Sequence, residues 1–155
     1  MKITKTDAVL INALQENARI GLETLSEMTG LSTATVQRHL KRLKDDGVIS
    51  QEVVLVDPTR AGQSMTFVVM VELERERLDQ LEEFTKRATA EAQVQQCYYI
   101  TGEADFCLVC TARDMDDYEA LTHRLFFGDA NVRRFRTSVV MSRKKVGLAV
   151  AVTAG

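Results

Sequence analysis

The chain has 155 residues, of which 45% are apolar, with 20 Lys and Arg against 22 Asp and Glu. This length fits one or two small domains with a packed core. The net charge of −2 argues against a strongly basic nucleic-acid coat and, as an average, favours an enzyme or a ligand-binding domain. There is no apolar run of membrane-spanning length and no signal peptide, so we expect a cytoplasmic protein without a membrane partner.

The first 50 residues predict three helices. A capping-box pattern at residues 4–7 precedes a helix of about residues 6–16. A short second helix ends at Gly30, and Ser32 is placed to cap a third. Two helices joined by a glycine turn, after a supporting helix, are typical of a helix-turn-helix. Residues 48–56 then predict a strand or a short wing.

Strands and helices alternate in the second part of the chain. Residues 65–73 are apolar on both faces, as in a strand that is covered on both sides. The later elements that we expect are a helix over 77–91, strands over 94–101 and 105–112, a helix from Asp114 to Gly128, a strand over 132–141 and a candidate fifth strand over 146–152. This order predicts a ferredoxin-like βαββαβ unit, with helices on one face of its sheet. The other face needs a cover, and a second subunit is the simplest one.

The predicted fold is therefore α+β, in three ranges. A winged-helix-like helix-turn-helix domain occupies 1–50, a strand or linker 51–62, and a ferredoxin-like domain 63–155. Residues 1–60 hold 8 basic and 8 acidic side chains, so the whole net charge belongs to the rest of the chain. Within the neutral part, residues 32–44 carry four cations and no acid.

The third helix has a composition suited to DNA. Gln37 and Arg38 have the donor groups that read adenine and guanine in a major groove. Lys41 and Arg42 lie further along the helix and suit phosphates. His39 is expected to be a neighbour of phosphate or a solvated residue. The alternative is a solvated basic face without a partner, but the three-helix pattern favours DNA binding.

The cysteines and histidines indicate no catalytic chemistry. Cys107 and Cys110 have CxxC spacing, but in a strand they point to opposite faces. We expect them and Cys97 to be buried, reduced thiols rather than a metal or redox site. Neither His39 nor His123 lies in a known catalytic motif, so no cofactor and no metal are expected.

Taken in order, these segments resemble the Lrp/AsnC (leucine-responsive/asparagine regulator) family of transcription factors. The resemblance runs from about Thr6 to Val146. It includes residues 14–20, the turn at 30–32 and residues 40–43, and later the turn Gly102-Glu103-Ala104-Asp105-Phe106, the family's Gly-x-x-Asp-aromatic element. It implies a helix-turn-helix joined by a strand linker to a ferredoxin-like domain that dimerises and often builds octamers. It also implies a small effector, commonly an amino acid, bound between subunits near that turn.

The resemblance assigns functional residues by position. The residues that it assigns to DNA binding are Ser32, Thr33, Ala34, Thr35, Gln37, Arg38, Lys41 and Arg42. The residues that it assigns to effector binding are Tyr99, Thr101, Gly102, Asp105, Met115, Thr137, Ser138 and Val139. The chain departs from the family at Thr33, where many relatives have proline, and at Glu103-Ala104, where bulkier residues are common.

The turn also has a physical interpretation. Gly102 allows close approach of a ligand, the N–H groups of the turn could hold a carboxylate, and Asp105 could hold an ammonium group. The alternative is a plain hairpin turn, in which Gly102 only supplies a positive φ and Asp105 caps its own backbone.

The predicted function is a sequence-specific, effector-modulated transcription regulator and not an enzyme. It binds double-stranded DNA as a dimer, a tetramer or an octamer. The alternatives are an architectural DNA-binding oligomer without an effector, and a ferredoxin-like enzyme or metabolite-binding protein. Because the N-terminal domain is neutral, affinity per subunit should be weak and salt-dependent, so that several subunits must bind together.

Overall fold

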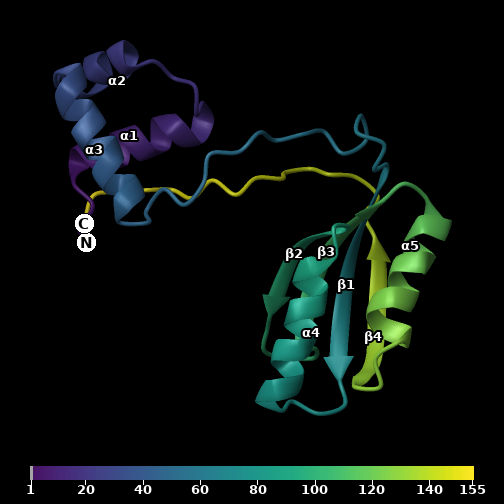
Figure 1. Cartoon of the computed structure of the whole chain (residues 1–155). Coiled ribbons are helices and arrows are strands. Elements are labelled where there is room, and N and C mark those ends of the chain that lie inside the picture. Colours follow the sequence, from purple (N-terminus) through teal and green to yellow (C-terminus); the bar gives the residue numbers. More distant parts are fainter. Residues whose placement is uncertain (1) are drawn as a thin grey trace. The chain divides into compact units, whose positions relative to one another are not determined.

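The computed structural model describes residues 2–155 and divides the chain into two compact units (Figure 1). The first unit contains the chain up to Val54 together with Lys145–Gly155, and the second contains Leu55–Lys144. Each unit has its own apolar core. The predicted range 63–155 thus includes a tail that the structure places with the first unit.

The first unit is the predicted helix-turn-helix. Its helices are α1 (Lys5–Glu16), α2 (Leu22–Thr29) and α3 (Thr33–Asp45). The capping box of α1 is present, because the Thr4 hydroxyl accepts from the Asp7 N–H and the Asp7 carboxylate accepts from the Thr4 N–H. Gly30 ends α2 with a φ of 69°, and the Ser32 hydroxyl caps α3 by accepting from the Thr35 N–H at 3.3 Å. The three helices share a core of Leu10, Ala13, Leu25 and Val36.

The second unit has the predicted ferredoxin-like order. Its elements are β1 (Met65–Leu73), α4 (Leu78–Ala90), β2 (Val94–Tyr99), β3 (Phe106–Ala112), α5 (Met115–Thr122), a π-helical turn η1 (His123–Phe127) and β4 (Val132–Val139). The sheet is antiparallel throughout, in the order β2-β3-β1-β4.

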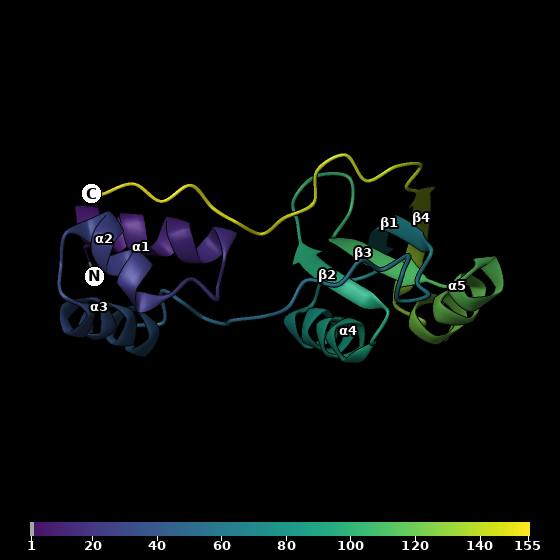
Figure 2. The same ribbon diagram turned by 90° about the horizontal axis from the view of Figure 1, so that it is seen from above.

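The two faces of this sheet differ. Phe67, Val69 and Val71 of β1 are buried against α4 and α5, which lie on one face of the sheet (Figures 1 and 2). The Phe67 ring stacks on Tyr118 of α5 with 3.8 Å between ring centroids. The alternate residues of β1, including Val68, point to the opposite face and are only half-buried. That face has no cover within residues 2–155, which is what the predicted second subunit would supply.

Two predicted strands are absent from the described residues. The strand or wing over 48–56 is wrong, because this segment pairs with no strand in residues 2–155 and Val53–Val56 are exposed. The fifth strand over 146–152 is also wrong, because this segment contacts α1 and not the sheet. The helix after Asp114 does end at Gly128, but its last turn is the π-helix η1.

The cysteines are less buried than expected. Cys110 is buried, whereas Cys97 and Cys107 are half-buried, so the prediction of three buried thiols is wrong for two of them. Burial raises the pKa of the Cys110 thiol to about 12, which keeps it protonated. Within the described residues, no cluster of His, Cys, Asp and Glu could hold a metal ion. None of the helices over residues 2–155 is long and apolar enough to cross a membrane.

Candidate nucleic-acid interface and effector site

One side of α3 and its N-terminal cap is open to solvent. The predicted DNA-binding residues that lie exposed there are Ser32, Thr33, Ala34, Gln37, Arg38 and Lys41. Arg38 donates to the Thr35 hydroxyl at 3.1 Å, and Lys41 forms an exposed ion pair with Asp45 at 2.7 Å. Both cationic groups remain accessible, so a phosphate or a base edge can replace these partners at little cost.

The other two predicted DNA-binding residues help to hold α3 in place. Thr35 is half-buried beside the Ser32 cap, with 3.0 Å between the two hydroxyl oxygens. Arg42 is also half-buried, and its guanidinium donates to the carboxylate of Asp7 on α1. The same carboxylate oxygen lies 2.8 Å from Nδ1 of His39. The expectation that His39 is solvated or beside phosphate missed this contact, because the partner lies 32 residues away in the sequence.

Asp7 is an ionised group inside the first unit, since its side chain is fully buried. Burial alone would raise its pKa. Hydrogen bonds from His39, from the N–H and hydroxyl of Thr4, and from Arg42 outweigh burial and hold the pKa far below its ordinary value of 3.8. The carboxylate is therefore charged at neutral pH and joins α1 to α3. The sequence indicated only its role in the capping box.

The predicted effector turn lies at one end of the sheet, between β2 and β3. The Asp105 N–H donates to the Val71 carbonyl at 2.9 Å, and its carboxylate accepts from the Leu73 N–H at 2.6 Å. Asp105 therefore fastens the turn to β1, and its second oxygen remains available. Gly102 has a φ of 120°, a conformation that other residues rarely adopt.

Tyr99, at the end of β2, and Thr101 also lie at this turn, whereas Met115 and residues 137–139 lie elsewhere on the same unit. Met115 begins α5, beyond the opposite end of β3, and is exposed. Val139 pairs with Phe67 near that same end, and the Thr137 hydroxyl lies 2.5 Å from the Tyr118 hydroxyl. At about 3.3 Å per residue, β3 separates the turn from Met115 by about 20 Å. One chain does not bring the two groups together.

An ionic network connects the turn to β4. Glu72 of β1 accepts three hydrogen bonds from the Arg134 guanidinium and lies 3.3 Å from that of Arg136. The Arg136 guanidinium also lies 3.7 Å from the carboxylate of Glu103 in the turn. A ligand that displaces Glu103 would therefore disturb β4. None of these residues was among the predicted site residues, because their pairing depends on strand register.

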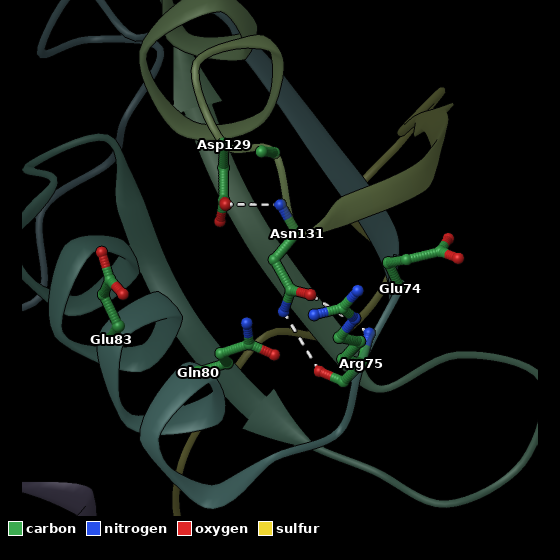
Figure 3. A pocket seen from close by; sticks show the side chains of 7 residues that line it. Glu74, Arg75, Gln80, Glu83, Asp129 and Asn131 are labelled. Carbon is green, nitrogen blue, oxygen red and sulfur yellow. Dashed lines mark hydrogen bonds between the residues drawn. The ribbon is translucent and has the colours of Figure 1, made fainter.

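A separate polar pocket of about 360 Å³ opens at the same end of the sheet (Figure 3). It is lined by Glu74, Arg75, Gln80, Glu83, Asp129, Ala130 and Asn131. Several of these groups are already paired: the Asn131 amide exchanges two hydrogen bonds of 3.1 Å with the backbone of Arg75, and Asp129 accepts from Arg87. The pocket contains none of the predicted effector residues.

Comparison with known families matches both units. Residues 3–50 match the model of a winged helix-turn-helix DNA-binding domain, and residues 66–150 match the Lrp/AsnC ligand-binding domain.

Relatives match along almost the whole chain. An HTH-type transcriptional regulator of Sinorhizobium fredii is 42% identical over 152 residues, which are 98% of this chain and 90% of that protein. The leucine-responsive regulatory protein of Haemophilus influenzae is 31% identical, over 90% of this chain and 84% of its own length. A transcriptional regulator from Neisseria meningitidis, solved as a complex with L-methionine, superposes with a TM-score of 0.87 at 27% identity and covers 94% of both chains.

Proposed function

Because the chain belongs to the Lrp/AsnC family, we propose that it is a DNA-binding transcription regulator controlled by a small effector. The observation that carries this proposal is the exposed basic side of α3. It presents Gln37, Arg38 and Lys41 on a helix that is fixed to its unit by a buried ionic contact. A rigid helix with such side chains fits a major groove.

In the complex that we propose, the residues of α3 have different roles. Gln37 and Arg38 contact base edges, while Lys41 contacts phosphate. The small exposed side chains of Thr33 and Ala34 allow the helix N-terminus to approach the bases closely. Arg42 acts mainly by positioning α3, because Asp7 occupies its guanidinium.

We also propose that the regulator acts as a homodimer or a higher even oligomer. The apolar outer face of the sheet supports this proposal, because Val68, Met70 and Val109 lie half-buried without cover in the described chain. The first 60 residues carry no net charge, so a single subunit would bind DNA weakly. Two or more linked reading helices raise the affinity through effective concentration.

The effector that we propose is an amino acid, bound between subunits. The L-methionine bound to the Neisseria meningitidis relative supports this class of ligand. The N–H groups of residues 101–103 donate to no acceptor within residues 2–155, so they are available to a carboxylate. The free oxygen of Asp105 is available to an ammonium group. Met115 and Val139 of the partner chain would complete the pocket.

A DNA-binding titration tests the proposed function. The protein is mixed with a fragment that carries the upstream region of its own gene, at several salt concentrations, with and without each of the twenty amino acids. We expect salt-sensitive binding that at least one amino acid changes, together with a raised melting temperature for that amino acid. Folded protein that binds no DNA contradicts the proposal. Binding that no amino acid changes would indicate an architectural DNA-binding oligomer instead.

A further inference from the structure

The C-terminal tail after β4 returns to the DNA-binding unit. The chain leaves this unit at Val54 and re-enters it at Lys145. The tail then runs beside α1, and its last residue, Gly155, donates its N–H to the Ile3 carbonyl at 3.2 Å. The two units are thus joined by two chain segments rather than by one linker.

Two amide side chains of α1 hold the tail. The Gln15 amide donates to the Val150 carbonyl at 2.9 Å and accepts from the Val150 N–H at 2.8 Å. The Asn12 amide makes the same pair of bonds to Val152, at 3.0 Å to the carbonyl and 3.4 Å from the N–H. Each amide therefore supplies a donor and an acceptor, as a neighbouring strand would.

The spacing of these residues matches an extended chain. Side chains three apart on a helix lie about 5–6 Å apart, while alternate residues of a strand are about 6.5–7 Å apart and use the same edge. The longer Gln15 side chain makes up the difference. Asn and Gln are the only side chains that offer both a donor and an acceptor in one planar amide. The contact thus selects an extended backbone and requires amides at both positions.

We propose that residues 146–155 act as a strap that Asn12 and Gln15 bind, and that this strap limits how freely the DNA-binding unit moves. This role rests on the proposed function, although the strap itself does not. Ten residues separate Val139, the end of β4, from Val150, the first tail residue that α1 holds. At full extension they span about 33–36 Å, so the strap sets an upper limit on how far the DNA-binding unit can move from β4.

Hydrogen exchange tests the strap without DNA. The double variant Asn12→Ala/Gln15→Ala is compared with the wild-type chain and with Glu16→Ala, which alters an exposed residue next to Gln15 on the same helix. We expect the amides of Val150 and Val152 to exchange about tenfold faster in the double variant and to be unchanged in Glu16→Ala. The variant Asn12→Asp/Gln15→Glu keeps the hydrogen-bond acceptors and loses the donors. Its Val150 and Val152 amides should therefore exchange at a rate between those of the wild-type chain and the double alanine variant. Equal exchange rates in all four proteins would contradict the proposal that Asn12 and Gln15 bind the strap.

DNA affinity tests the role of the strap. On the fragment with the upstream region, a chain that stops at Lys145 and the double alanine variant should bind about three- to tenfold more weakly than wild type, because a freer unit loses more entropy on binding. Glu16→Ala should bind like wild type. If the Val150 and Val152 amides exchange faster in the double alanine variant while its DNA affinity is unchanged, the strap does not restrain the DNA-binding unit. If wild type binds no DNA, the proposed function fails, while the exchange result still decides whether the strap exists.

Discussion

Arg42, on α3, donates a hydrogen bond to Asp7, a fully buried carboxylate on α1. His39 contacts the same carboxylate oxygen from one turn earlier on α3. A charged group in the interior is stable only when partners compensate it, and these two side chains supply the compensation. The orientation of α3, the helix that we propose reads DNA, thus depends on a residue whose side chain is fully buried.

Replacing Asp7 with asparagine should destabilise the DNA-binding unit. The substitution keeps the size of the side chain and an acceptor for Thr4, but it removes the charge that Arg42 faces. We expect the free energy of unfolding to fall by about 2–3 kcal/mol. This is less than the cost of breaking a fully buried ion pair, because Arg42 is 41% exposed. Urea unfolding followed by circular dichroism measures it. A loss below 0.5 kcal/mol, in the range typical of a surface substitution, would contradict this role.

The stability difference between wild type and Asp7→Asn should depend on pH. The pKa of Asp7 is lower in the folded chain than its ordinary value of 3.8, so ionisation of Asp7 stabilises the folded state. This contribution is complete above the unfolded pKa and decreases as pH falls below it. The stability difference between wild type and Asp7→Asn should be constant from about pH 7 to pH 5 and shrink below about pH 4. A difference that grows on acidification would show the opposite sign of the shift.

Arg38 and Arg42 should respond differently to alanine. Arg38 is exposed and contacts only Thr35 within α3, so Arg38→Ala should cost about 1–3 kcal/mol of specific DNA affinity and leave stability within 0.5 kcal/mol. Arg42→Ala should lower stability by about 1–3 kcal/mol, because Asp7 loses a charged donor. Fluorescence anisotropy with labelled DNA and thermal unfolding separate the two effects. Oligomer size should not change in either variant, and the assignment fails if the two variants behave alike.

A charge on the outer face of the sheet should dissociate the oligomer. Val68 pairs with Val109 on β3 and with Ser138 on β4, so it lies centrally on this face. Val68→Arg should raise the dissociation constant of the dimer more than tenfold, because the buried cation would have no partner. Leu78→Arg on α4, an exposed apolar residue on the helical side, is the control. Light scattering after gel filtration gives the masses, and a dimeric Val68→Arg protein would place the interface elsewhere.

The sequence was sufficient wherever structure depends on near neighbours. Gly30 and Ser32 mark the helix-turn-helix because a left-handed C-cap and a hydroxyl N-cap act within a few residues. The apolar run over 65–73 predicted the strand β1, and the alternation of strand and helix patterns after it predicted the sheet and its two helices. These local rules fixed the fold class and the exposed side of α3.

Features that depend on distant partners could not be predicted from the sequence. Arg42 has the composition of a phosphate contact, and only the packing of α1 on α3 brings it to Asp7, 35 residues away. The valines of 146–152 have the period of a strand, but no sequence rule identifies the amides of α1 as their partners. The family resemblance groups Met115 with the effector residues by position, but it does not show that β3 separates Met115 from the turn within one chain.

The separation of Gly102 from Met115 on one chain has a genetic consequence. In the pocket that we propose between two subunits, the turn comes from one chain and the Met115 end from the other, so a symmetric dimer would have two such pockets. The substitutions Gly102→Val and Met115→Asp would each damage both pockets of a homodimer. In a mixed dimer both lesions fall in one pocket and the other is intact. Two unresponsive alleles expressed together should therefore restore a partial response to the effector.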